Sequence, residues 1–354
     1  MINTGIRFCF SPASLYFRVG MKKNFRTIFQ YLLFLSVGLF FAWLSLKNLD
    51  QEKTEQIKLA FRNARHWLAI PVIFILLSSH LVRALRWRLL MEPMGYQPTR
   101  KNAFFAVMIG YLVNMGVPRL GEIVKCTVLA RYEKIPADKL VGTIILERMI
   151  DALTLLVVFG ITLVIQPHLY EQIISAFFSS TGKPEEKKMS TLLFTLIIAG
   201  TIFLITAIWM LVKKKTISDL QAIFIRIWKS VIQGISTIQH LKKRKEFVFY
   251  TFLIWLLYLA GGYIGFMAFR ETELYGVKEA FTILSAGSIG MIASPGGIGA
   301  YAYLIEKTME LYGLNYTIAL AFGWILWLAQ TAVILLGGIA SFSALPFFNK
   351  KEKK

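Results

Sequence analysis

The sequence has 354 residues, of which 56% are hydrophobic, and a formal net charge of +20. Several apolar runs approach the ~20 residues that a helix needs to cross a ~30 Å hydrocarbon core, so the composition indicates an all-α polytopic membrane protein and excludes an ordinary soluble one. The basic residues lie at the ends of the apolar runs, which favours anionic lipid head groups at the cytoplasmic face as partners and argues against nucleic acid.

The chain opens with a segment, residues 1–20, that resembles neither a signal peptide nor a strong helix. Met21 begins "MKKNFRTIFQYLLFL", which is a typical start for a membrane protein. We therefore expect the leader to be non-native or disordered and Met21 to be an alternative start.

Six apolar segments are predicted to cross the membrane, at residues 27–46, 67–90, 139–165, 190–212, 247–269 and 316–345. Two further apolar regions, 103–132 and 280–312, are each interrupted halfway by Pro and Gly. Lys and Arg in the short loops place the N-terminus and the basic tail 346–354 in the cytoplasm only if both interrupted regions return to the side that they enter from. We therefore expect six transmembrane helices and two re-entrant helical hairpins.

Between the fourth and fifth crossings, residues 216–245 show apolar side chains at helical spacing with Lys and Arg between them. This pattern predicts an amphipathic helix on the cytoplasmic leaflet. A soluble helix packed against the protein is the alternative.

An internal repeat relates the two interrupted regions. Pro118 and Pro295 are 177 residues apart, and the same offset pairs Gly110 with Gly287. Each half contains three crossings, an odd number, so the second half is expected to be inverted relative to the first, as in many transporters. The repeats are predicted at residues 21–165 and 190–345, with an external loop at 166–189.

The two interruptions place irregular backbone at membrane depth, where it is tolerated only if it is buried in protein or lines a cavity. The ends of short helices there leave N–H and C=O groups for a ligand, and glycine lets the backbone approach that ligand closely. Easier helix packing is the alternative role for glycine, and we prefer it for the GxxxG spacing of Gly261 and Gly265. We predict hairpin breaks at Pro118, Gly121 and Pro295, and substrate contacts at Ser294, Gly296, Gly297 and Gly299.

The third span carries Glu147, Arg148 and Asp151 inside its apolar run. Glu147 and Asp151 are spaced i,i+4 and share one helix face, while Arg148 is i,i+3 from Asp151. Each such charge at the bilayer centre costs ~2.5–3.5 kcal/mol on insertion scales, so partners are required. Arg119 and Glu122 of the first hairpin are candidate partners, and a pairing of Arg119 with Glu147 or Asp151 would fix the hairpin to the third span.

Two roles remain open for these charges: an ion-pair lock that holds the hairpin, or a polar pocket for a charged head group. Asn114 is expected to add amide contacts, and Lys125 to extend toward the interface. Arg83 and Arg86 are assigned to the cytoplasmic boundary of the second span. The predicted head-group residues are Asn114, Arg119, Glu122, Glu147, Arg148 and Asp151. The two cysteines and four histidines form no metal-ligand pattern, and no cofactor-binding motif is present, so we expect no cofactor and no metal.

Three motifs occur in order: "NMGVPRLGE" at 114–122, "ERMID" at 147–151 and "SPGGIGAY" at 294–301. Together they resemble the lysylphosphatidylglycerol synthetase transmembrane-domain family, also called flippase-like. In the multiple-peptide-resistance proteins of that family, the transmembrane domain is taken to move aminoacylated phosphatidylglycerol between leaflets. A separate soluble domain makes that lipid, and the few residues after the last predicted span leave no room for it here.

The resemblance implies a lipid flippase or transporter of the cytoplasmic (inner) membrane that moves a phospholipid or a lipid-linked head group, and not an enzyme. A departure concerns the acidic residue that members often carry after the second glycine-rich tip, where this chain has Ala302 and only Glu306 one turn later. The missing acid weakens the case for a cationic lipid. The alternatives are a non-transporting protein that binds or regulates envelope-lipid synthesis, and an intramembrane lipid transferase.

Overall fold

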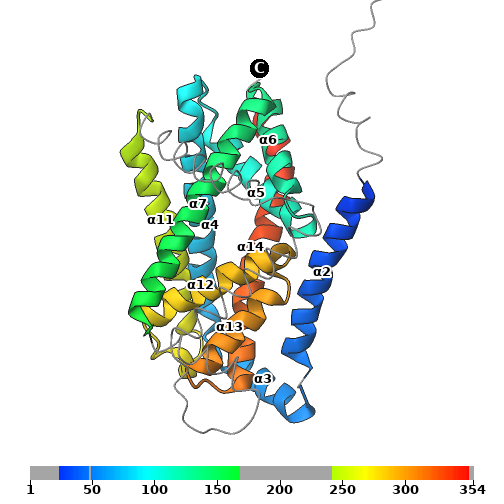
Figure 1. Cartoon of the computed structure of the whole chain (residues 1–354), viewed down its shortest axis with the longest axis vertical. Helices are drawn as coiled ribbons and strands as arrows, with labels where there is room; N and C mark the ends of the chain where they lie inside the picture. The colour runs from blue at the N-terminus through cyan, green and yellow to red at the C-terminus, as the bar shows by residue number, and fades with distance from the viewer. Residues whose placement is uncertain (1–23, 48, 168–240, 351–354) are drawn as a thin grey trace, which may run out of the picture.

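The computed structural model describes residues 24–47, 49–167 and 241–350 of the chain (Figure 1). Within these ranges the regular secondary structure is helical throughout. The predicted crossing at 190–212 and the leader 1–20 lie outside the described residues, as do most of the predicted loop 166–189 and of the amphipathic helix 216–245.

Four helices of the described ranges have the length and hydropathy needed to cross a membrane, in agreement with four of the predicted crossings. They are His66–Met94, Ala137–Ile165, Arg244–Phe266 and Tyr316–Lys350. The first of these contains α4 (Ala69–Met91), and the other three are α7, α11 and α14. The predicted first crossing coincides with α2 (Asn24–Leu46), of which Leu35–Leu46 is recorded as a shorter apolar helix.

The last helix, α14, extends to Lys350 and so takes up half of the predicted tail, with Pro346 inside it. The Asn349 amide nitrogen donates hydrogen bonds to the Leu345 carbonyl at 2.8 Å and to the Asn102 amide oxygen at 2.9 Å. The hydrogen bond to Asn102 holds the last turn of α14 against the first turn of α5 (Arg100–Gly116).

Each predicted hairpin region forms two helices joined by a break. The first consists of α5 and α6 (Leu120–Glu133), and the second of α12 (Val277–Ala293) and α13 (Ala300–Leu311). Figure 1 shows the first pair in the upper half of the molecule and the second pair in the lower half.

Both breaks have the same cause, a proline that follows directly on the helix. The residue before Pro118 and the residue before Pro295 have extended backbone, because the proline ring excludes the helical conformation from its predecessor. The residue after each proline is left-handed, with φ of 67° at Arg119 and 58° at Gly296. Glycine adopts this conformation freely, whereas arginine is strained in it.

The helices of the two halves recur at the spacing seen in the sequence. The helices α5 and α12 both have 17 residues, and both their first and their last residues are 177 positions apart. The helices α4 and α11 both have 23 residues.

The two broken hairpins meet at their tips. A Cβ atom on Gly296 would lie 3.5 Å from the Met115 Cα, near the end of α5. The Trp327 indole N–H donates a hydrogen bond of 3.0 Å to the Gly296 carbonyl, which fixes the second tip to α14. The turn of the second hairpin therefore lies against the end of α5, next to the first break.

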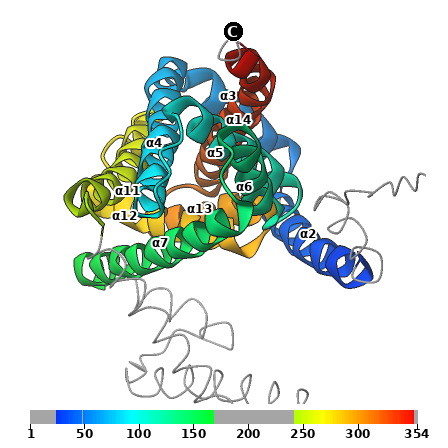
Figure 2. The ribbon, with the colours of Figure 1, turned by 90° about the horizontal axis from the view of Figure 1, so that it is seen from above.

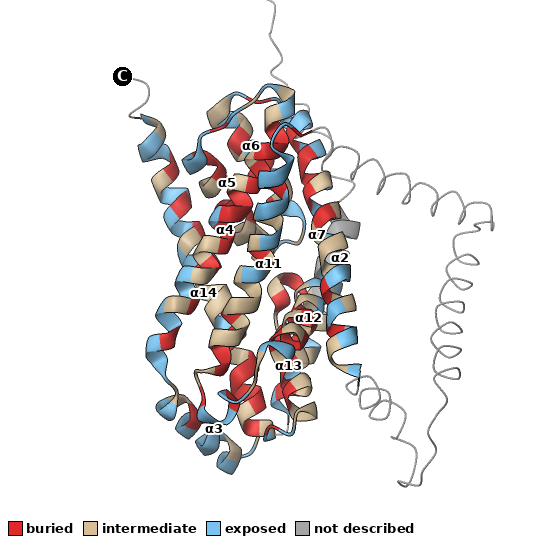
Figure 3. Cartoon of the chain, turned by 90° about the vertical axis from the view of Figure 1, so that its left-hand side faces the viewer, coloured by how far each residue is buried: buried red, intermediate tan, exposed pale blue. Residues whose placement is uncertain are grey.

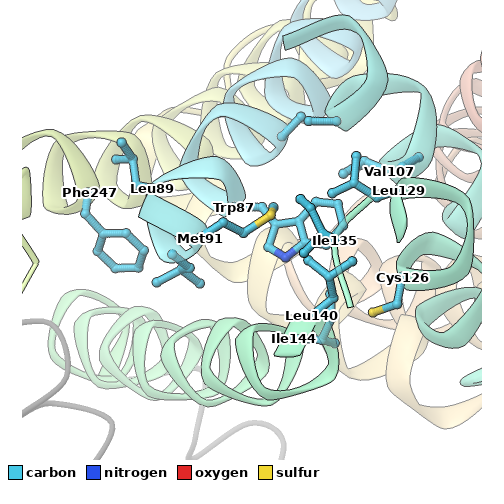
Figure 4. Packing of buried hydrophobic residues seen from close by; sticks show 14 of the residues in the cluster. Trp87, Leu89, Met91, Val107, Cys126, Leu129, Ile135, Leu140, Ile144 and Phe247 are labelled. Atoms are coloured by element: carbon cyan, nitrogen blue, oxygen red, sulfur yellow. The ribbon is translucent and has the colours of Figure 1, made fainter. Parts of the chain in front are cut away.

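Three apolar clusters of buried residues lie in the described part of the chain, and the two larger ones lie toward opposite ends of the bundle. Figure 4 shows the first around Trp87, which is fully buried and donates its indole N–H to the Thr143 hydroxyl at 2.8 Å. The second contains Phe266 and Phe322, whose stacked rings lie 5.3 Å apart.

Many residues along the long helices are exposed (Figure 3). Among the large hydrophobic side chains there, the exposed fraction reaches 82% at Val164 and 72% at both Ile70 and Phe74. Soluble monomers rarely expose apolar surface on this scale, so these faces are suited to contact with lipid chains.

The helix α2 lies at the edge of the bundle (Figure 2). Although it is the first of the described helices, its main contacts in the described part of the chain are with the second hairpin: α12, α13 and the short turn Pro295–Gly297 between them. An early segment of the chain is therefore packed on the second hairpin.

Candidate functional site

Six charged side chains from three helices form one group, which we call the ion-pair cluster: Arg83 and Arg86 of α4, Lys125 of α6, and Glu147, Arg148 and Asp151 of α7 (Ala137–Ile165). Helical spacing brings them together, because residues three or four apart share a helix face. The first hairpin and the second and third predicted crossings are thus joined inside the bundle.

The Glu147 carboxylate is the centre of this cluster, and its side chain has no exposed surface. The Lys125 ammonium lies 2.8 Å from one of its oxygens. The other oxygen is 3.1 Å from the Arg148 guanidinium and is also paired with Arg83 and Arg86, at 3.5 and 3.7 Å. Four cations therefore surround this buried carboxylate, more than pair with any other carboxylate of the described residues.

Asp151 lies one helical turn further along α7 and is paired with three of the same cations. Its side chain is 15% exposed. The Arg86 guanidinium donates a 2.6 Å hydrogen bond to one carboxylate oxygen, and Arg83 and Arg148 pair with the other, Arg148 at 3.4 Å. Arg83 and Arg86 of α4 therefore each pair with both Glu147 and Asp151 of α7.

Aromatic side chains also contact the cations of the cluster. The Lys125 ammonium lies 4.0 Å from the centre of the Trp87 ring, a distance at which the ring face attracts a cation. The Arg83 guanidinium donates a 3.1 Å hydrogen bond to the Tyr258 hydroxyl on α11 (Arg244–Phe266) and lies 5.9 Å from the Tyr111 ring. These contacts fix the cluster to α5 and α11 as well.

Of the residues predicted from the sequence, Glu147, Arg148 and Asp151 come together here. Glu122 is at the margin of the cluster, 3.9 Å from Arg148, with 34% of its side chain exposed. Asn114 does not contact these charges: its amide oxygen accepts a 2.8 Å hydrogen bond from the Gly121 N–H and so ties the two arms of the first hairpin together.

Arg119 was expected to pair with Glu147 or Asp151, and that expectation is wrong. Its side chain is exposed at the break, and no ion pair joins it to a carboxylate in the described ranges. The arginines of α4 occupy the places that we assigned to it, because Arg83 and Arg86 pair with Glu147 and Asp151.

Three cluster members were missed or misread from the sequence. Arg83 and Arg86 were assigned to a helix boundary, yet they are 5% and 0% exposed. Lys125 was expected to extend toward the interface, yet it is 5% exposed and bound to Glu147. The i,i+3 spacing of two arginines within an apolar helix was the available signal, because it places both on one face.

The residues predicted at the second break form a separate group at the hairpin tip. The Ser294 hydroxyl donates a 2.9 Å hydrogen bond to the Ile298 carbonyl, which closes the turn. Gly296, Gly297 and Gly299 all have positive φ values, of 58°, 71° and 68°. Pro295 starts this turn, and the glycines allow the chain to reverse there.

Glu306, named above as a replacement for the acid missing at Ala302, is fully buried on α13. It accepts a hydrogen bond from the Ser45 hydroxyl of α2, and the Lys307 ammonium lies 3.1 Å from its other oxygen. It therefore joins α2 to the second hairpin and is remote in sequence and in contacts from the ion-pair cluster.

Replacing Gly299 with alanine is expected to loosen α2. The new Cβ would collide with the Gly38 carbonyl and lie 2.5 Å from the Ala42 nitrogen, both on α2, and φ is already unfavourable for alanine. Overpacking adds ~1–3 kcal/mol to the strain, so the free energy of unfolding in detergent should fall by more than in Gly313→Ala. That control shares a positive φ, at +82°, but has no atom within 4 Å of its Cβ. Equal losses of unfolding free energy in both variants would show that the contact between Gly299 and α2 does not contribute to stability.

A narrow cleft leads to the cluster between the first hairpin and α7. Its volume is about 20 Å³, and its lining includes Tyr111, Asn114, Glu122, Lys125 and Arg148. This space accommodates roughly one water molecule. The lining also includes the apolar side chains of Val107 and Ile144. Of the two cluster residues that line the cleft, Arg148 is the more exposed, at 43% of its side chain.

Comparison with known proteins was made on the whole chain. A family model described as the lysylphosphatidylglycerol synthase TM region matches residues 29–338. A UPF0104 membrane protein of Methanothermobacter thermautotrophicus is 24% identical over 307 residues, which are 79% of this chain and 84% of that protein. A second UPF0104 membrane protein, of Methanocaldococcus jannaschii, is 28% identical over 98 residues, so the match spans 27% of this chain and 29% of that protein. No solved structure matches the chain.

Proposed function

This chain belongs to the family of the lysylphosphatidylglycerol synthase TM region, and from that premise we propose that it is a lipid flippase or transporter and not an enzyme. It moves a phospholipid or a lipid-linked head group between the leaflets of the cytoplasmic membrane. Its six crossings and two re-entrant hairpins form inverted halves, with both termini in the cytoplasm. Anionic lipid head groups bind the basic residues at that face.

The observation that carries this proposal is the position of the ion-pair cluster. It lies between α4 and α7, which are both long and apolar enough to cross a membrane, and it is joined to a broken hairpin by Lys125. Charges in such a place are costly and mark substrate pathways in membrane proteins. The apolar outer faces leave lipid chains in the bilayer while the polar interior shields a head group.

The recurrence of helix lengths supports the inverted repeat. Discontinuous helices that meet near the midplane, one from each half, are the usual substrate site of transporters built from such repeats. The close approach of Gly296 to Met115 supports a meeting of this kind. In the proposed mechanism the two halves rock against each other and exchange this contact, and that motion gives alternating access.

Replacing Asp151 with asparagine is expected to slow lipid transfer about tenfold or more, because loss of one partner of a buried charge pair costs ~2–5 kcal/mol. The measurement is leaflet transfer of fluorescent phosphatidylglycerol and phosphatidylethanolamine in vesicles that contain the purified protein. Asp138→Asn is the matched control, since Asp138 is exposed in the first turn of the same helix.

Three results would contradict the proposal. Wild-type protein without transfer of any labelled lipid would favour a binding or regulatory protein. A new lipid product in mass spectrometry would favour a transferase. Unchanged transfer in Asp151→Asn, with protein that elutes as folded, would remove the ion-pair cluster from the pathway.

A further inference from the structure

A second buried acid, Glu306 of α13, lies where α2 meets the second hairpin, and its side chain has no exposed surface. One carboxylate oxygen accepts a hydrogen bond from the Ser45 hydroxyl in the last turn of α2. The Trp324 indole N–H of α14 donates to the same hydroxyl oxygen at 3.4 Å. The other carboxylate oxygen has no hydrogen bond among the described residues, although the Lys307 ammonium lies 3.1 Å away. Three helices therefore enclose an acid that is only partly hydrogen-bonded.

The charges around Glu306 do not balance. Lys307 is shared with Glu310, whose carboxylate lies closer to the ammonium, at 2.7 Å. The next cation, Lys53 of α3 (Gln51–Asn63), pairs with Asp50 at 3.1 Å. Two ammonium groups thus face three carboxylates, and one negative charge is in excess.

The remaining ionisable groups nearby do not supply the missing positive charge. Tyr316 of α14 is a phenol whose ring lies 5.6 Å from the Lys307 ammonium, and its hydroxyl donates a 2.7 Å hydrogen bond to the Ser45 carbonyl. Lys47 directly follows α2, and its ammonium lies over the Trp43 ring, 5.3 Å from the ring centre. Residues two apart do not share a helix face, so Trp43 and Ser45 point in different directions. One proton on Glu306 would balance the group.

A proton is also the ligand that fits this place chemically. An uncompensated carboxylate in a dry site is costly, and adding a proton removes the charge. A serine hydroxyl both donates and accepts, so Ser45 can bond Glu306 in its charged and in its protonated form. A hard metal cation would need several oxygen ligands and would meet the Lys307 ammonium at the open oxygen.

The acid can be reached from the side of the membrane opposite to the cytoplasm. In Figure 1, α13 and the end of α2 lie in the lower half of the molecule, whereas the C-terminus is at the top. The proposed topology places that terminus in the cytoplasm. The exposed fraction is 42% for Lys307 and 28% for Glu310, which lies one turn nearer to the end of α13. Partly exposed polar groups therefore lead from the outer surface to Glu306.

We propose that Glu306 is a proton-binding site that couples lipid transfer to a proton gradient across the membrane. One proton from the outer side adds to the carboxylate, and Lys307 then pairs with Glu310 alone. A charge-assisted hydrogen bond is roughly twice as strong as a neutral one, so protonation loosens the second hairpin from Ser45 of α2. The same proton leaves toward the cytoplasm when the halves rock back. This assignment rests on the proposed function, for which it names the energy source.

Coupling is tested with the purified full-length protein in vesicles that contain fluorescent phosphatidylglycerol and carry an imposed pH gradient. The gradient should raise the rate of leaflet transfer at least about fivefold, the lower end of the usual coupling between two sites. A protonophore should abolish that increase. Glu306→Gln should transfer lipid at one rate with and without the gradient, whereas Glu306→Asp, which keeps an ionisable group, should retain part of the increase. Glu271→Gln removes an exposed carboxylate from the turn Arg270–Thr272 and should respond as the wild type does.

Three results would overturn the site or its ligand. A wild type that transfers lipid at the same rate with and without the gradient would refute the coupling. A response that Glu306→Gln keeps and Glu306→Asp loses would show that the shape of the side chain matters and the proton does not. Stimulation by a sodium gradient at constant pH, in place of the pH gradient, would exclude the proton as the coupling ion.

Proton binding is measured without transport by infrared spectroscopy of the protein in detergent. A pH titration should show the band of a protonated carboxyl group that is lost in Glu306→Gln and kept in Glu271→Gln. Ser45→Ala should keep this band and lose the response to the gradient, because the proton still binds but α2 no longer senses it. Identical titrations of the wild type and Glu306→Gln would refute the site. A band that depends on Glu306, in protein that transfers no lipid, would leave the proton site standing and refute the transport proposal alone.

Discussion

The variant Glu147→Ala is expected to lose roughly 3–5 kcal/mol of unfolding free energy, the usual cost of removing one partner of a buried ion pair. Four cations converge on this carboxylate, and the Lys125 ammonium lies 2.8 Å from it in a site with no exposed surface. Without Glu147, Asp151 is the one buried carboxylate left to the cluster. The resulting repulsion acts on α4, α6 and α7 together, so the first hairpin should detach. Denaturant unfolding in detergent micelles measures the loss.

Two comparisons separate this effect from a general sensitivity to lost charge. Glu55→Ala removes a carboxylate 2.7 Å from the Lys58 ammonium, but both side chains are about two-thirds exposed. Such a surface pair contributes only ~0–1 kcal/mol. Combining Glu147→Ala with Lys125→Met should recover part of the loss, because one uncompensated cation is removed. A loss below that of Glu55→Ala would mean that Glu147 does not hold the cluster together.

The variant Gly121→Ala is expected to force the arms of the first hairpin apart. A Cβ atom at this position would overlap the Gly110 carbonyl and lie 2.6 Å from the Asn114 side chain, and neither helix backbone can yield cheaply. Overpacking of this kind costs ~1–3 kcal/mol and occasionally more. Lys125 lies one turn after Gly121 on α6, so the displacement also moves its ammonium away from Glu147. We expect lower thermal stability and slower lipid transfer in the same variant.

The control for this prediction is Gly160→Ala in α7. A Cβ at Gly160 meets no atom within 4 Å, and alanine is favoured over glycine inside a helix by up to ~1 kcal/mol. The control should therefore be as stable as the wild type or more so. Wild-type stability in Gly121→Ala would show that the hairpin arms do not cross as closely as described.

The hairpin breaks could be predicted from the sequence because their cause is local. A proline excludes helix at the residue before it, and this rule gave the position of both turns from Pro118 and Pro295 alone. The charged positions on α7 could also be predicted, because a charged residue inside an apolar run is recognised without knowing its neighbours in space.

The partners of those charges could not be predicted, because they depend on how helices pack. From the sequence alone, Arg83 and Arg86 were assigned by the rule that basic residues gather at the cytoplasmic ends of membrane spans. Only the packing of α4 against α7 shows that these two side chains are buried. The prediction for Arg119 was wrong for a related reason. Its backbone is left-handed, and the sequence does not predict this conformation at a residue other than glycine.

The packing of α2 on the second hairpin has a consequence for biosynthesis. Ser45 and Glu306 are hydrogen-bonded although 261 positions separate them. At ~5–20 residues per second, roughly 13–50 s pass between the synthesis of the two residues. During that interval the first helix resides in the bilayer or beside an insertion factor without its final neighbour. The nascent chain therefore depends on a long-lived intermediate, and a ribosome stalled before α13 would leave that helix permanently unassembled.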